Sequence, residues 1–291
     1  MRAAINGIEL EYETFGDSDD PTLVLIAGVG AQLVWFHPEL CEGFVDRGFH
    51  VVRFDNRDVG RSTWVDTDVD AAEAIGRTLA GEAVDAPYDL DDMAADVLGL
   101  CDHLDLDRPC LFGVSMGGMI AQQAAIRAPD RVGALASVMS TTGDPDVGQP
   151  TPAAVSALLA ASPAERDLYV ARAVEKGEVL AGDGGEVDLD WVAERAGLAF
   201  DRGVNPDATS RHLLAILVSP PRSAGLRALD VPALVIHGEQ DPLVTVSGGE
   251  RTAECLRDSE FLRLDGMGHD LPRYYWATVI HHVVALAARA G

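Results

Sequence analysis

Short apolar runs recur along the chain and predict buried strands. Six runs of five or six residues, rich in aliphatic and β-branched side chains, are bounded by turn residues. Apolar runs of this length, flanked by turn residues, are typical of strands that are covered on both faces, as in a parallel sheet. They are Thr22–Ala27, His50–Phe54, Cys110–Val114, Ala134–Met139, Ala233–His237 and Glu260–Leu264.

Between these runs, apolar residues recur at helical spacing. The stretch Leu90–Leu104 has this pattern, and a second helix is predicted from about Met116 to Arg127, ending near Pro129. Strands that alternate with helices in this way predict an α/β fold, a mostly parallel central sheet flanked by helices and joined by right-handed crossovers.

One segment interrupts the alternation. Residues 142–229 contain no convincing strand but several helical patterns, among them Pro152–Ala161, Pro163–Val174 and Trp191–Phe200. An insertion between late strands is positioned to cover the carboxyl ends of the sheet, where open α/β sheets bind ligands. We therefore expect a core of residues 1–141 and 230–291 and a helical lid of residues 142–229.

The strongest chemical motif is Gly113-Val114-Ser115-Met116-Gly117. It follows a predicted strand and opens a predicted helix. A sharp turn there would expose the Ser115 hydroxyl, and glycine at both flanking positions removes side chains that would collide in such a turn. An incidental turn serine is the alternative, but the strand before and the helix after favour a nucleophile.

A serine nucleophile needs a histidine base, oriented in turn by a carboxylate. Of eight histidines, His269 lies in a glycine-rich loop after the last predicted strand, and Asp241 follows the strand before it. Both would project from the same sheet edge as Ser115. Asp144, after the strand that follows the nucleophile helix, is the competing acid, but its loop is more simply the start of the lid.

Acyl transfer also needs hydrogen-bond donors for the developing oxyanion. We expect one from the backbone N–H of Met116, at the start of its helix, and one from Val29 in the loop Gly28-Val29-Gly30 after the first long strand. The segment Asp55–Ser62 contains Asp and Arg residues around a glycine turn. We interpret these residues as pairing to fix the loop, a structural role. The chain has no dinucleotide or P-loop motif, no cluster of residues at metal-ligand spacing and no C-x-x-C pair, so we expect no cofactor and no metal.

Charge excludes several partners. The chain carries 22 basic and 47 acidic residues, a net charge of −25, and only Lys176 among the basic residues is lysine. Such a polyanion repels nucleic acid and anionic membranes, and its field favours neutral over anionic ligands.

No apolar run of the sequence is long enough to span a membrane. The N-terminal segment lacks the pattern of a signal peptide, and we expect a cytoplasmic protein whose four cysteines are buried thiols.

Four longer motifs of the chain resemble one known superfamily. GVSMGGM, DNRDVGRS, VPALVIHGEQDPLV and DGMGHDLP resemble serine esterases of the α/β-hydrolase superfamily, notably the aclacinomycin methylesterase group and mycobacterial lipase/esterase-like hydrolases. The resemblance covers nearly the whole chain, is weakest in the lid, and implies an α/β-hydrolase fold. It also implies Ser115, Asp241 and His269 as catalytic triad, with Val29 and Met116 as oxyanion donors. Ala27-Gly28 replaces the usual His-Gly of the oxyanion loop, and Arg57-Asp58 replaces the usual Arg-Gly.

Together these patterns predict a serine hydrolase that cleaves a neutral, moderately hydrophobic carboxylic ester through an acyl-serine intermediate. A perhydrolase, a lactonase or a C–C bond hydrolase with the same triad is the alternative enzyme, and a receptor-like binding protein with slow turnover is the non-enzyme alternative. Four aromatic residues near the lid and the oxyanion loop are candidates for the substrate pocket: Trp35, Phe36, Trp191 and Phe200.

Overall fold

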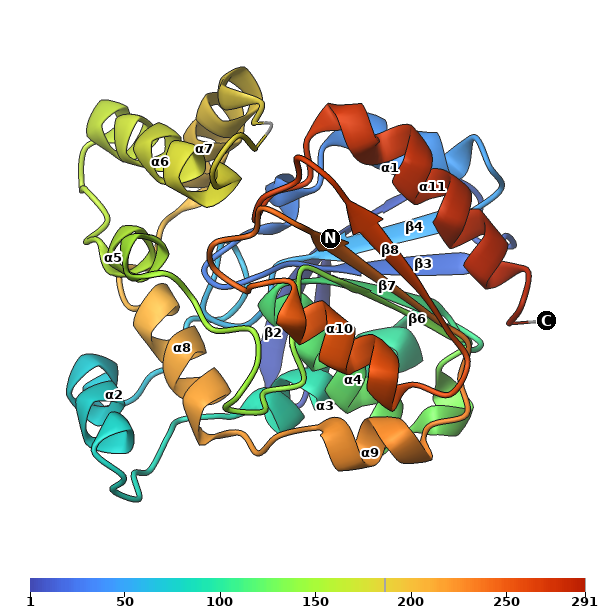
Figure 1. Ribbon diagram of the computed structural model, residues 1–291, viewed down its shortest axis with the longest axis horizontal. Coiled ribbons are helices and arrows are strands. Elements are labelled where there is room, and N and C mark those ends of the chain that lie inside the picture. The colour runs from blue at the N-terminus through green and yellow to red at the C-terminus, as the bar shows by residue number, and fades with distance from the viewer. Residues whose placement is uncertain (186, 291) are drawn as a thin grey trace.

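The computed structural model describes residues 1–185 and 187–290 and contains one eight-stranded sheet. The strand order is β1-β2-β4-β3-β5-β6-β7-β8 (Figure 1). All six predicted strands are confirmed, with ends that differ by at most one residue. The strands are β1 (Arg2–Ile5), β2 (Ile8–Phe15), β3 (Thr22–Ile26), β4 (His50–Phe54), β5 (Cys110–Val114), β6 (Ala134–Val138), β7 (Ala233–Gly238) and β8 (Ser259–Leu264).

The sheet is parallel from β4 to β8, and an antiparallel hairpin of β1 and β2 extends it at one edge. The sequence prediction missed this hairpin. Asn6 and Gly7 form its turn with φ of 51° and 82°, the left-handed pair that an Asn-Gly hairpin turn requires. This dipeptide, between alternating apolar and polar residues, is the signal that could have located both strands.

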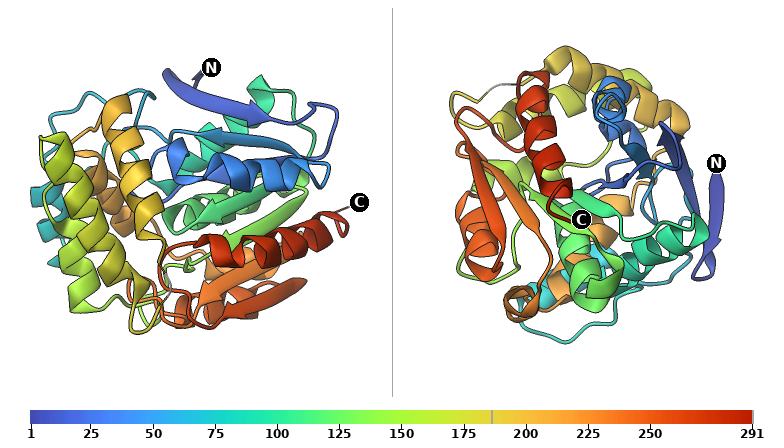
Figure 2. Two further views of the ribbon diagram at one scale, coloured as in Figure 1. Left: turned by 90° about the horizontal axis from the view of Figure 1, so that it is seen from above. Right: turned by 90° about the vertical axis from the view of Figure 1, so that its right-hand side faces the viewer.

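Helices cover both faces of the sheet (Figure 2). One face packs against α3, α4, α10 and the short helix α9 (Ser223–Ala228), and the other against α1 and α11. The N-terminus of α3 is stabilised by a capping box, in which Asp89 and Asp92 bond reciprocally to backbone N–H groups. The core helices are α1 (Pro38–Val45), α2 (Ala71–Leu79), α3 (Leu90–His103), α4 (Met116–Arg127), α10 (Ser247–Cys255) and α11 (Arg273–Ala287).

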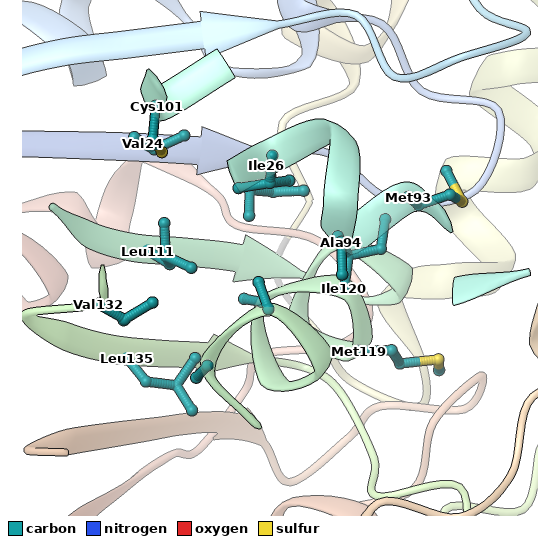
Figure 3. Packing of buried hydrophobic residues seen from close by; sticks show 14 of the residues in the cluster. Val24, Ile26, Met93, Ala94, Cys101, Leu111, Met119, Ile120, Val132 and Leu135 are labelled. Atoms are coloured by element: carbon teal, nitrogen blue, oxygen red, sulfur yellow. The ribbon is translucent and has the colours of Figure 1, made fainter. Parts of the chain in front are cut away.

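The larger hydrophobic core lies between the sheet and the pair α3 and α4. Figure 3 shows aliphatic side chains of β3, β5 and β6 facing those of the two helices. Val24, Leu111 and Ile120 are each 0% exposed, so this side of β5 and α4 is fully enclosed. The four cysteines are also buried and free, as predicted.

Within the described residues, the insertion between β6 and β7 contains five helices and no strand. Three of them, α5 (Pro152–Leu159), α6 (Arg166–Ala181) and α7 (Leu189–Arg202), lie across one end of the sheet (Figure 2). The other two return to the core, where α8 (Ala208–Val218) packs against α2 and α9 (Ser223–Ala228) packs beside α4 and α10. No helix in the described part of the chain combines the length and the apolar character that crossing a bilayer requires.

Candidate active site

Ser115 occupies the sharp turn between β5 and α4. Its backbone has φ 56° and ψ −121°, a region that residues other than glycine rarely adopt and that is concentrated at functional sites. A Cβ atom on Gly113 would collide with the carbonyl of Gly117, and one on Gly117 would collide with the carbonyl of Ile26. Both glycines are therefore required by the close approach of the strand, the turn and the helix.

This packing predicts a stability effect. Replacing Gly117 by alanine is expected to lower the free energy of unfolding by about 1–3 kcal/mol or more, because the new methyl group must displace backbone. Gly76→Ala is the matched control: Gly76 is exposed in α2 with nothing near its Cβ position, so alanine there is expected to stabilise by ~0.5–1 kcal/mol. Urea denaturation of both variants measures the difference, and equal midpoints for Gly117→Ala and wild type would contradict the packing argument.

His269 connects Ser115 to Asp241 by two hydrogen bonds. Its Nε2 lies 2.9 Å from Oγ of Ser115, and its Nδ1 lies 2.7 Å from Oδ2 of Asp241. A carboxylate can only accept, so Nδ1 carries the proton and Nε2 is free to accept one from the serine hydroxyl. The structure thus brings together the three residues that the sequence placed after β5, β7 and β8.

Asp241 is held in its ionised form. Burial acts to raise its pKa, but the imidazole of His269 and hydrogen bonds from His237 and His269 outweigh burial and hold the pKa of Asp241 well below its ordinary value. Its Oδ1 also accepts the N–H groups of Leu243 and Val244, both at 2.9 Å. A fixed negative charge therefore faces Nδ1 of His269.

Asp144, the competing acid, lies elsewhere. Its carboxylate accepts hydrogen bonds from the hydroxyls of Thr142 and Ser223 and from Arg251. These contacts lower the pKa of Asp144, with the Ser223 hydrogen bond the largest cause. The residue holds the start of the insertion against α9 and α10, and no hydrogen bond joins it to His269 among the described residues.

The loop after β3 lies against Ser115. A Cβ atom on Gly28 would stand 3.2 Å from Cβ of Ser115 and 3.6 Å from its Oγ, so the backbone of this loop is within reach of a reacting group on the serine. Among the described residues, the N–H groups of Val29 and Met116 have no hydrogen-bond acceptor. Both N–H groups are therefore available to an oxygen atom bound beside Ser115.

The insertion holds this loop in place. His212 of α8 accepts the N–H of Gly30 at its Nδ1 (3.1 Å) and donates from Nε2 to the carbonyl of Arg57 (2.9 Å). Burial lowers the pKa of His212 by more than the Arg57 hydrogen bond raises it, and a neutral ring is the form that can accept at Nδ1. The amide of Gln32 donates to the carbonyls of Ala199 and Gly203 at 3.0 and 2.8 Å.

The Asp55–Ser62 loop has a structural role, and its contacts reach the helical insertion. Asp55 is fully buried and bonds to the N–H of Leu33 and to Arg202 of α7. Asp58, which stands where the resemblance has glycine, adopts φ 69°, and its carboxylate bonds to Tyr88 and to Arg211 of α8. Asp58 therefore anchors the insertion.

The histidine loop is also supported by the insertion. The N–H of His269 donates to the carbonyl of Leu180 at the end of α6 (2.7 Å). Arg195 of α7 forms a two-fold ion pair with Asp270, at 3.0 and 3.1 Å. Leu180 bonds to His269 itself and Arg195 bonds to the next residue, Asp270. Helices α6 and α7 therefore fix the position of the candidate base.

A cavity of about 200 Å³ opens at Ser115 and His269. Its walls come from the loop after β3, the ends of β5 and β6, and helices α5 to α7, and most of the side chains are apolar. The lining comprises residues 28–32, Val34, Trp35, Val114, Ser115, Met139, Leu158, Tyr169, Ala173, Lys176, Gly177, Leu180, Val192, Arg195, Ala196, Ala199, Leu243 and His269.

Of the four aromatic pocket candidates, only Trp35 lines this cavity. Phe36 is fully buried in the core beneath α1, Trp191 packs edge-on against His37, and Phe200 stacks obliquely on Tyr169. The sequence could not place these three side chains, because helical spacing shows that a residue faces inward but not which neighbour it faces. Tyr169, Lys176 and Arg195 were missed, and Lys176 alone had a signal, as the single lysine of the chain.

A model of the family described as the alpha/beta hydrolase fold matches residues 21–272. The chain is 28% identical to rhodomycin D methylesterase DnrP of Streptomyces peucetius over 284 residues, which cover 91% of this chain and 90% of that protein. It is 26% identical over 258 residues to 3-oxoadipate enol-lactonase 2 of Acinetobacter baylyi, covering 86% and 82%.

Solved structures share the fold. An enol-lactonase from Burkholderia xenovorans superposes with a TM-score of 0.71 at 24% identity, covering 99% of this chain and 100% of that one. An esterase from Rhodococcus sp. gives a TM-score of 0.72 at 18% identity, covering 100% and 98%. At these identities the likeness concerns the arrangement of the sheet and the helices.

Proposed function

Because the chain belongs to the alpha/beta hydrolase fold family, we propose that it is a serine esterase that cleaves a carboxylic ester through a covalent acyl intermediate on Ser115. That it is a hydrolytic enzyme follows from relatives named as methylesterase and enol-lactonase, which match about nine-tenths of the chain. The observation that carries the mechanism is the position of His269, hydrogen-bonded to the Ser115 hydroxyl on one side and to the Asp241 carboxylate on the other.

In the first half-reaction, Oγ of Ser115 attacks the ester carbonyl carbon while its proton passes to Nε2 of His269. The charge that develops on the carbonyl oxygen is stabilised by the N–H groups of Val29 and Met116. The tetrahedral intermediate formed in this way collapses, and the C–O bond to the alcohol breaks. His269 returns the proton to the leaving alkoxide. Asp241 stabilises the imidazolium that forms between these two transfers.

In the second half-reaction, His269 takes a proton from water, and the hydroxide adds to the acyl carbon. The Ser115 ester bond then breaks, the proton returns to Ser115, and the acid leaves. Helices α5 to α7 of the insertion 142–229 act as the lid that limits water around this intermediate. Lactone opening uses the same steps with a leaving group that stays attached, and the enol-lactonase relative favours it as the second candidate.

The covalent step can be tested directly. A serine-directed fluorophosphonate should add to the protein once, and peptide mass spectrometry should place the adduct on Ser115. A panel of p-nitrophenyl esters with acyl chains of increasing length should show turnover that the same reagent abolishes. Labelling at another serine, with turnover lost, would remove Ser115 from the mechanism.

A second test concerns the oxyanion loop. His212→Phe keeps a ring in α8 but removes the acceptor of the Gly30 N–H, and we expect kcat to fall about tenfold with a smaller change in KM, because the donor at Val29 loses its fixed position. His50→Phe is the matched control. It removes another buried imidazole, bonded to Thr22 at the far end of the sheet, and should retain wild-type kcat. Equal kcat for both variants would contradict this role of His212.

The net charge of the chain and the charges inside the cavity act on a substrate over different distances. The net charge of −25 predicts neutral esters, but fields from exposed charges are screened beyond ~10 Å in physiological salt. Groups inside the cavity act over shorter distances and with less water between them. The charges that line the cavity therefore decide between a neutral and an anionic substrate.

A further inference from the structure

The charge of the cavity is opposite to that of the molecule. Although 47 residues of the chain are acidic, no carboxylate lines the cavity within the described residues, whereas Lys176 and Arg195 both do. Lys176, on α6, is the only lysine of the chain. A wall with this composition differs from the rest of the surface and indicates a specific electrostatic role.

The two cations differ in their partners. The guanidinium of Arg195 is neutralised by its two-fold ion pair with Asp270 and lies over the ring of Trp35, 5.4 Å from its centroid. The ammonium of Lys176 has no hydrogen bond and no ion pair among the residues that the structure describes. One uncompensated positive group therefore shares the cavity with Ser115 and His269.

An unpaired ammonium in such a place is unfavourable without a ligand. Burial lowers the pKa of Lys176, and the positive charge of Arg195 lowers it further. A negative group bound beside it would act in the opposite direction and favour the charged form of Lys176. A desolvated cation with three unused donors is thus suited to an anion that arrives with the substrate.

We propose that this enzyme acts on esters that carry a second, ionised carboxyl group, which the ammonium of Lys176 binds inside the cavity. The proposal rests on the esterase function proposed above and adds the substrate class. The apolar residues that line the cavity together with Lys176, among them Ala173, Leu180 and Val192, would accommodate the methylene chain between the ester and the carboxylate. Such a substrate is a half-ester of a dicarboxylic acid.

The test compares each half-ester with its uncharged twin. Monomethyl esters of glutaric, adipic, pimelic and suberic acids are paired with the corresponding primary amides, which have the same shape without the charge. Binding is measured by calorimetry in Ser115→Ala protein, so that turnover does not interfere. We expect the best acid to bind at least about tenfold more tightly than its amide, as a charged hydrogen bond allows.

Three further variants assign the effect. Ser115→Ala combined with Lys176→Met should lose the preference for the acid, and the combination with Lys176→Arg should retain part of it. Arg172→Met is the matched control, since it removes a positive charge from an exposed position on the same helix, outside the cavity lining, and should leave the preference unchanged. Circular dichroism checks that each variant is folded.

The proposal is overturned if acid and amide bind equally, if neither binds at millimolar concentration, or if the preference survives Lys176→Met. Turnover by the wild type distinguishes failure of the substrate class from failure of the proposed esterase function. Hydrolysis of the amide twins as fast as of the acids would refute the substrate class and leave the esterase intact. Selective binding of the acids without hydrolysis of any ester would support Lys176 and refute the esterase.

Discussion

Ester hydrolysis is expected to fall by about six orders of magnitude in kcat when Ser115 is replaced by alanine, the effect seen when a serine nucleophile is removed from a triad that acts as a unit. In this structure the hydroxyl of Ser115 is partly exposed in the cavity, and its side-chain hydrogen bond goes to His269. Since it packs little, the variant should unfold at nearly the wild-type temperature. The measurement is kcat on the best p-nitrophenyl ester, together with a thermal melt.

Ser137→Ala provides the control for this variant. Its hydroxyl is buried on the neighbouring strand β6, where it accepts a hydrogen bond from Gln122 at 3.0 Å, outside the cavity lining. Loss of this bond should reduce stability by about 1 kcal/mol and leave kcat nearly unchanged. If Ser115→Ala retained turnover comparable with Ser137→Ala, the acyl-serine mechanism would be wrong.

Replacing Asp241 by asparagine is expected to lower kcat by about four orders of magnitude. The amide can still accept the N–H groups of Leu243 and Val244 at its oxygen, and its NH₂ then faces Nδ1 of His269. That nitrogen must accept instead of donate, so the proton moves to Nε2, where it blocks removal of the Ser115 proton. Steady-state kinetics with the same ester gives the ratio.

Asp144→Asn tests the other carboxylate. Asp144 contacts Thr142, Ser223 and Arg251 at the base of the insertion, so its loss should reduce thermal stability with little change in kcat. A large fall in kcat for Asp144→Asn and a small one for Asp241→Asn would reverse the assignment of the acid.

Some of these features could be read from the sequence because they depend on neighbours along the chain. A buried strand needs a run of apolar residues, and the turn at Ser115 needs glycine at 113 and 117, where the structure leaves no space for a Cβ atom. Ser115, Asp241 and His269 each follow a strand, and the carboxyl ends of parallel strands share one edge of the sheet. Their meeting at this edge could therefore be predicted. The hairpin of β1 and β2 was equally local and was missed only because Asn6-Gly7 was not interpreted as a turn.

The walls of the cavity were decided by tertiary structure alone. Helical spacing in the insertion was the same for Trp191, which packs against His37, as for Arg195, which lines the cavity one turn later. His212 and Gly30 are 182 residues apart in the chain, and no local pattern records their hydrogen bond. The net charge of −25 predicted a neutral substrate, yet the single lysine of the chain lines the same cavity as Ser115. The charge that a ligand meets depends on which few side chains the fold gathers around it and not on their sum along the chain.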